Sequence, residues 1–218
     1  MHRALVLALA IPMLLTGRAD AQGPNPEGPW QWSGFYVGLG LGGGVAVQTQ
    51  ILNDIIFGSF SERSSGGGAL ATATVGYDWP VNQNVVAGAF FDLDISGISN
   101  ENFGFLSLPV DHRYSASIGG RIGYLMTPST LWYLSGGYSR ARFDYLLLGN
   151  FDFDGIFAGA GIEKRFASNL SMRAEYRYAH YFTETLFDLC GCGSFEGQAD
   201  VHTARVTLVY SLGAEAPP

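Results

Sequence analysis

Residues 170–178 read Leu170-Ser171-Met172-Arg173-Ala174-Glu175-Tyr176-Arg177-Tyr178, and apolar and polar side chains alternate along the whole run. Successive side chains of a β-strand point to opposite faces of a sheet. This segment therefore presents leucine, methionine, alanine and tyrosine on one face, and serine, arginine and glutamate on the other. Such a strand separates an apolar environment from a polar one.

The same period of two recurs along the chain and indicates eight strands in total. Their expected bounds are 34–48, 68–79, 85–95, 113–125, 131–144, 154–166, 170–182 and 200–212. Only the fifth segment leaves its outward face open, because Trp132 and Leu134 compete for it with Leu131 and Tyr133.

The gaps between these segments alternate in length. Residues 80–84, 126–130 and 167–169 are short and rich in turn formers, whereas the other gaps are mostly much longer: 49–67, 96–112, 145–153 and 183–199. A membrane sheet must close on itself, because lipid offers its backbone no hydrogen-bond partners. We therefore expect an all-β fold, an eight-stranded antiparallel transmembrane β-barrel over residues 34–213, with short periplasmic turns and long extracellular loops.

A soluble β-sandwich is the main alternative to this barrel. Its solvent-facing strands would normally carry more charge than a chain in which 14% of residues are charged. A soluble periplasmic barrel is a third option.

The first residues indicate export. Arg3 precedes an apolar run that ends at Leu15, and Ala19-Asp20-Ala21 fits the small-x-small cleavage rule. Residues 1–21 are therefore expected to be a signal peptide, 22–33 a periplasmic lead rich in proline and glycine, and 214–218 a short tail. The expected location is the outer membrane.

Composition and patterning exclude several classes of protein. The net charge of −7 argues against a nucleic-acid partner, which would require a basic stripe. The chain after Leu15 contains no apolar run of about 18 residues, so a helical membrane protein is excluded. The glycines of 38–44 resemble a phosphate loop, but no helix follows them, and no cofactor is expected.

The polar faces of the strands should line the barrel interior. Glu163 is expected to lie opposite Arg173 if the turn at 167–169 is tight, and arginine forks suit carboxylates. The favoured interpretation is an ion-pair network that plugs a narrow lumen, and the alternative is a charged gate in a small channel. The expected network comprises Asp78, Asp92, Arg121, Glu163, Arg165, Arg173, Glu175, Arg177 and Arg205.

Aromatic side chains near the strand ends are expected to form girdles at the membrane interfaces. Tyr114 and Phe143 are further candidates for the outer girdle, beside Tyr178. The expected girdle comprises Phe35, Tyr77, Trp79, Tyr124, Phe166, Tyr176, Tyr178 and Tyr210.

Few residues point to catalysis. His180 and His202, with Glu184 close in sequence, leave a lipid-modifying enzyme as a minor alternative, but no motif supplies a nucleophile. We therefore expect no enzyme activity. An exported setting favours a disulfide between Cys190 and Cys192, although the one-residue spacer would strain it, and the pair alone makes an incomplete metal site.

Several runs resemble the small OmpA-like outer-membrane β-barrel proteins of alphaproteobacteria, relatives of the opacity-type surface antigens. The runs are 32–38 (WSGFYVG), 136–141 (GGYSRA), 160–166 (AGIEKRF) and 173–178 (RAEYRY). The resemblance implies an exported barrel that is usually not an enzyme. It also implies an assembly signal at Tyr210 and Leu212, although Leu212 stands where the family usually has phenylalanine.

These observations support two functions. The first is a plugged barrel that contributes to envelope integrity and surface interactions, and the second is a small channel gated by lumenal ion pairs. The expected partners are outer-membrane lipid and lipopolysaccharide, the barrel-assembly machinery, and host or phage surfaces that meet the acidic loops.

Overall fold

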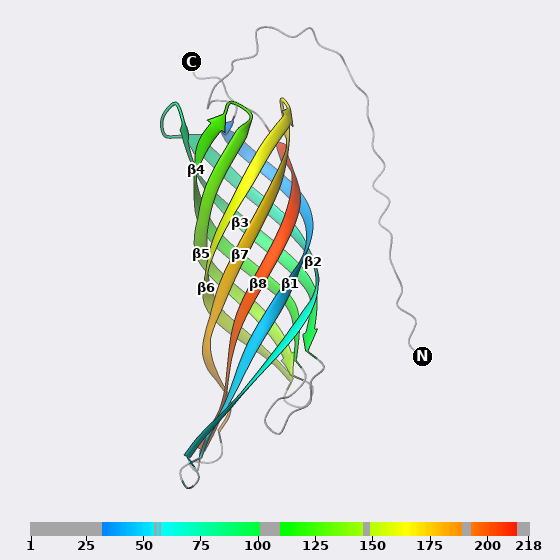
Figure 1. The fold of residues 1–218 in the computed structure, drawn as a ribbon, viewed down its shortest axis with the longest axis vertical. Coiled ribbons are helices and arrows are strands. Elements are labelled where there is room, and N and C mark those ends of the chain that lie inside the picture. Colours follow the sequence, from blue (N-terminus) through cyan, green and yellow to red (C-terminus); the bar gives the residue numbers. More distant parts are fainter. Residues whose placement is uncertain are drawn as a thin grey trace, which may run out of the picture.

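Eight antiparallel strands close into a barrel in the computed structural model (Figure 1). Each strand pairs with the next, and β1 pairs with β8, so the predicted eight-stranded antiparallel barrel is confirmed. The structure describes residues 32–54, 56, 58–100, 110–145, 149–188 and 193–212, and the expected signal peptide lies outside them. No helix among these residues is long and apolar enough to cross a membrane. The strands are β1 (Gly34–Asp54), β2 (Gly58–Pro80), β3 (Val85–Asn100), β4 (Val110–Thr127), β5 (Thr130–Tyr145), β6 (Gly149–Ala167), β7 (Leu170–Asp188) and β8 (Gly193–Ser211).

Tight turns connect the strands at one end of the barrel, which we call the inner end. The turns span 81–84, 128–129 and 168–169, and both β1 and β8 have their terminal ends here. In the first turn the Asn82 side chain accepts hydrogen bonds from the backbone N–H groups of Asn84 and Val85, at 2.9 and 3.0 Å. Such side-chain capping explains why asparagine marks this turn.

At the opposite, outer end the strands are longer than expected. Strand β1 continues to Asp54 and β2 begins at Gly58, so most of the expected loop 49–67 is strand. The other connections at this end span 101–109, 146–148 and 189–192. The long outer loops that the sequence predicted are therefore not confirmed, and 101–109 is the longest connection that remains at this end. Beyond the membrane the outward face of a strand need not be apolar. The alternation of apolar and polar residues therefore ends there, although the hydrogen bonding between the strands continues.

The barrel wall splits into two sheets near the outer end. Pairing between β6 and β7 stops at Gly155 and Tyr181, and pairing between β2 and β3 stops at Gly67 and Ser99. We call the first of these openings the β6–β7 seam. Strands β7, β8, β1 and β2 continue as one sheet, and β3 to β6 continue as the other. Figure 1 shows β1 and β2 running together to a narrow tip.

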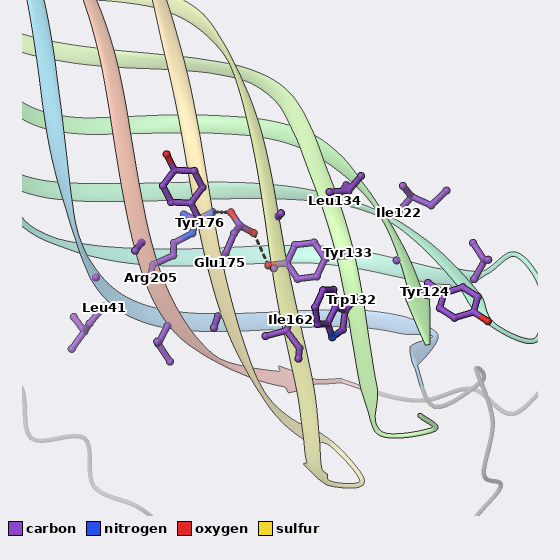
Figure 2. Close-up of a pocket in the computed structure, with 18 residues that line it drawn as sticks. Leu41, Ile122, Tyr124, Trp132, Tyr133, Leu134, Ile162, Glu175, Tyr176 and Arg205 are labelled. Atoms are coloured by element: carbon purple, nitrogen blue, oxygen red, sulfur yellow. Dashed lines mark hydrogen bonds and ion pairs between the residues drawn. The ribbon is translucent and has the colours of Figure 1, made fainter. Parts of the chain in front are cut away.

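The outward face of the closed part is an apolar band. Leu41 and Leu134 are 73% and 65% exposed, and such exposure of large apolar side chains is typical of a lipid-facing wall. The fifth strand turns Trp132 and Leu134 outward and buries Leu131 and Tyr133, which resolves its open face. A shallow hollow of about 990 Å³ in this band is lined largely by apolar side chains (Figure 2).

Candidate functional site

The inner half of the lumen contains a ladder of buried ion pairs. Arg121 donates from Nη1 to Glu163 at 2.7 Å and also pairs with Asp78. Arg173 donates from Nε to the same Glu163 oxygen at 2.9 Å, and Ser171 donates to the other at 2.5 Å. Glu163 and Arg173 face each other across the β6–β7 ladder. One carboxylate thus holds two arginines together across the barrel.

Above these pairs lies a ring of two arginines and two carboxylates. Arg177 donates to Asp92 at 2.7 Å and to Glu175 at 2.9 Å. Arg205 donates to the same two carboxylates, at 2.9 and 2.7 Å, and Figure 2 shows its contact with Glu175. Arg205 also reaches Asp94 at 3.2 Å. We call the two groups together the ionic layer: Asp78, Asp92, Arg121, Glu163, Arg173, Glu175, Arg177 and Arg205.

The ionic layer is close to electroneutral, since it holds four arginines and four carboxylates. Every member is buried. An unpaired charge in such a place would be very costly, so the pairing is what allows these residues to fill the lumen. Arg165, the ninth residue expected in the network, lies below the layer instead.

Two tyrosines that the sequence analysis missed support the ionic layer. The Tyr36 ring lies 5.0 Å from the guanidinium carbons of both Arg121 and Arg173, and Tyr133 donates to Glu175 at 2.7 Å (Figure 2). Each tyrosine faces a glycine on the neighbouring strand, Tyr36 at Gly76 and Tyr133 at Gly161. A Cβ at either glycine would come within 2.4 Å of a tyrosine ring atom or hydroxyl. A pairing of tyrosine with glycine across the ladder is thus the signal that would have revealed them.

The inner mouth of the lumen is closed by an apolar cluster. Trp32 is 2% exposed and packs with Val86, Leu125 and Leu131. Its indole N–H donates to the Pro128 carbonyl at 3.1 Å. The Arg165 guanidinium lies 4.7 Å above the indole ring. Trp32 therefore anchors the chain before β1 inside the mouth.

The outer part of the lumen is filled by rings instead of charges. Phe143, Tyr145, Phe153 and Tyr181 are all at most 4% exposed, and we call them the aromatic layer. The ring centroids of Phe143 lie 5.3 Å from Phe153 and 5.6 Å from Tyr181. Phe143 was expected as a candidate for the outer girdle, and that assignment was wrong, because its position on β5 faces inward.

A cavity of about 20 Å³ lies between the ionic and aromatic layers. This is room for roughly one water molecule. His112, Ser115, Ser117 and Ser139 contribute to its lining. Buried polar and aromatic side chains thus surround this small cavity on both sides.

The expected girdle residues all lie on the outward face. Phe35, Tyr124 and Phe166 are exposed near the inner end, and Phe35 packs edge-on against Tyr77 with centroids 4.8 Å apart. Tyr176 and Tyr178 lie further along β7. Trp79 and Tyr210 are also exposed, and Leu212, the second residue of the expected assembly signal, follows β8 at the inner end. Cys190 and Cys192 lie outside the described residues.

The two histidines that raised an enzymatic alternative belong to a cluster on the outward face of β7 and β8. His180 Nδ1 lies 2.8 Å from Asp200, and Tyr178 donates to the same oxygen at 2.7 Å. His202 Nδ1 lies 2.7 Å from the Tyr176 hydroxyl. Within the described chain these contacts supply no serine or cysteine nucleophile, and no group of three or more side chains suited to a metal occurs there.

Comparison with known proteins agrees with this architecture. The family model described as the outer membrane protein beta-barrel domain matches residues 7–211. The 22 kDa outer membrane protein of Rhizobium leguminosarum bv. viciae is 32% identical over 189 residues, covering 84% of this chain and 79% of the relative. The 25 kDa outer-membrane immunogenic protein of Brucella canis is 29% identical over 221 residues, covering 95% and 96%.

Among solved structures, that of outer membrane protein AlkL in DMPC lipid bilayers matches with a TM-score of 0.48 and 16% identity. The match covers 92% of this chain and 98% of that one. The family model gives the fold and the compartment, and the names of the two relatives give the same compartment. The chain therefore belongs to the outer membrane protein β-barrel family and is a protein of the cell outer membrane.

Proposed function

We propose that this protein is a non-enzymatic, sealed barrel that stabilises the outer membrane and presents its outer end to the cell's surroundings. The observation that carries the proposal is the filling of the lumen at successive levels. The Trp32 cluster, the ionic layer and the aromatic layer follow one another from the inner mouth to the outer end. A solute would have to displace all three.

The ionic layer supports a structural role because its members are bonded to one another. Glu163 and Glu175 each accept hydrogen bonds from two arginines, which lie on different strands. Arg121 connects β4 with β2 and β6, while Arg205 connects β8 with β3 and β7. Links of this kind across a barrel resist deformation of the wall, which suits a protein under mechanical load in the envelope.

The orientation follows from the turns. In barrels of this kind the short turns face the periplasm, so the inner end would lie there and the outer end would lie at the cell surface. The barrel-assembly machinery would then meet Tyr210 and Leu212 on the inner side. Lipopolysaccharide, and host or phage surfaces, would meet the outer end.

A small channel is the second candidate, and the arginines in the lumen favour it, since charged rings line many selective pores. A gate of this type must open by separating ion pairs. Each arginine of the upper ring is bonded to both carboxylates, so opening would leave several buried charges unpaired at once.

A gene-deletion strain distinguishes the two functions. The sealed-barrel proposal predicts greater sensitivity to detergent and more vesicle release after deletion, with unchanged uptake of small solutes. Complementation with the wild type should restore resistance. Reduced solute uptake, with normal detergent resistance, would instead favour the channel and overturn the proposal.

A further inference from the structure

The outward wall changes from apolar to charged at a defined level on β4 to β6. Along β5 the outward residues Trp132, Leu134 and Tyr138 are followed by Arg140 and Arg142. On β6 the apolar Ile162 and Ile156 are followed by Asp154 and Asp152, which face the two arginines across the ladder. Exposing a charged side chain to hydrocarbon costs several kcal/mol, so charged side chains on the outward face are expected at the level of the lipid headgroups. This level of the wall therefore marks the headgroup region.

A β-bulge adds a third arginine to this group. The pairing of β4 with β5 shifts between His112 and Tyr114, and Arg113, within the shift, is exposed. Its Nε lies 2.5 Å from Asp144. We call the whole group the outer arginine cluster: Arg113, Arg140 and Arg142, with Asp111, Asp144, Asp152 and Asp154.

The aspartates hold the arginines in fixed positions without using all their donors. Arg142 donates to Asp152 from Nε at 2.6 Å and from Nη2 at 2.9 Å, and its guanidinium lies 5.3 Å from the Tyr114 ring. Arg140 shares Asp152, at 3.3 Å, and lies 3.8 Å from Asp154. The hydrogen bonds from Arg142 lower the pKa of Asp152, a residue beyond the apolar band, so these pairs stay ionised at neutral pH. An arginine carries five donors, so several N–H groups remain available.

We propose that the outer arginine cluster binds the phosphate groups of lipopolysaccharide in the outer leaflet. Arginine forks match phosphate oxygens, and the cluster lies where the headgroup of a lipid beside the wall would lie. The apolar side chains below it, among them Tyr138 and Ile156, would contact the acyl chains. Lipopolysaccharide brings divalent cations with its phosphates, and these would offset the four aspartates.

This inference deepens the proposed role in the envelope but rests on the membrane placement and not on the sealed lumen. An experiment can therefore contradict the lipopolysaccharide site without contradicting the sealed lumen, and the reverse also holds. A conducting barrel would still bind lipopolysaccharide through this cluster, and a sealed barrel without this binding would still resist solute flow.

The test compares thermal unfolding of the purified protein with lipopolysaccharide and with the same lipopolysaccharide after enzymatic dephosphorylation, in Mg²⁺-containing phosphatidylcholine vesicles. We expect intact lipopolysaccharide to raise the Tm and the dephosphorylated form to do so far less. The double variant Arg140→Gln with Arg142→Gln should bind at least about ten-fold more weakly, since two charge-assisted hydrogen bonds to phosphate are lost. Arg63→Gln, an exposed arginine of β2 far along the tip, is the matched control and should bind as the wild type does.

The slower gel migration of boiled samples confirms that each variant folds before it is compared. Equal stabilisation by the two forms of lipopolysaccharide would overturn the proposal. So would full binding by the folded double variant, or a loss of binding in Arg63→Gln as large as that in the double variant. Equal binding of phosphatidylglycerol would overturn the assignment to lipopolysaccharide.

Discussion

The ionic layer and the aromatic layer fill the same lumen with opposite chemistry. In the closed part of the barrel, arginines and carboxylates cross the interior and bond to strands on the far side, as Arg205 does from β8 to Asp92 on β3. Beyond the β6–β7 seam, the interior is filled by Phe143, Phe153 and their neighbours. The change coincides with the point where the wall stops being a closed ring.

The difference reflects the shape of the space to be filled. A closed eight-stranded wall leaves a narrow, nearly round interior in which long side chains must pair with partners opposite. Two sheets face to face enclose a flatter space, which suits interleaved rings as in a β-sandwich. The inner part of the interior is therefore filled by paired charges, and the outer part resembles the core of a sandwich.

Removal of Glu163 should have the largest effect on stability. The Glu163→Ala variant leaves Arg121 and Arg173 without their shared acceptor, and breaking a buried pair in this way costs about 3–5 kcal/mol. Urea unfolding in lipid vesicles, followed by tryptophan fluorescence, measures the loss. The exposed Glu184→Ala on β7 is the matched control and should leave the midpoint unchanged. A loss below about 1 kcal/mol in the free energy of unfolding would show that the stability of the barrel does not depend on the buried ion pairs of Glu163.

Truncation of the aromatic layer should cost somewhat less. The Phe143→Ala variant removes a ring that is 1% exposed, and we expect a loss of about 3 kcal/mol in the free energy of unfolding. The value lies at the low end for phenylalanine because the two sheets, open at the seam, can close partly over the gap. The same urea series measures it, with Ile56→Ala at the exposed tip as control. A loss larger than that of Glu163→Ala would reverse the ranking of the layers.

A conservative exchange inside the ionic layer should show that geometry matters beyond charge. Arg121 contacts Asp78 and Glu163 with different nitrogens of one planar group. The Arg121→Lys variant keeps the charge but reaches both carboxylates poorly, and we expect a loss of about 1–3 kcal/mol. Arg140→Lys on the exposed outer wall is the control, where the same exchange should have little effect. Equal stability of Arg121→Lys and the wild type would mean that the layer acts by charge balance alone.

Hydrogen exchange should detect the boundary between the closed wall and the part beyond the β6–β7 seam, and it requires no substitution. Amides of 149–154 that face the β6–β7 seam lack a partner strand within the described residues, whereas those of 156–162 are bonded on both sides. We expect exchange at least about ten-fold faster in the first group, since open edges lie at the low end of local stability. Equal protection in both groups would place the end of the closed wall further out.

The sequence predicted the closed part of the barrel well because two environments act there at once. The apolar and polar faces of residues 170–178 record both lipid and lumen, so the strand and the inward positions of Arg173, Glu175 and Arg177 were visible. At the outer end only the inner face is constrained. Gln48 and Gln50 are buried there and the outward side chains are mixed, so the alternation failed and strand was taken for loop.

The alternation of polar and apolar residues could not predict which side chains meet across the lumen. The alternation predicts that Asp92 and Arg205 point inward. Their ion pair also depends on the tilt of the strands and on the closure of the barrel, which bring together strands far apart in the chain. The fifth strand shows the same limit, because both of its faces carry apolar side chains, and Tyr133 became identifiable only from the pairing with Gly161. Trp32 precedes the first strand and follows no alternation at all.

Single-channel recording in planar lipid bilayers tests the central claim that the lumen is closed by successive layers. We expect the wild-type protein, inserted and shown to be folded by the shift of its unboiled gel band, to give no conductance steps under applied voltage. Reproducible steps from the folded wild type would contradict the account and turn the ionic layer from a seal into a gate.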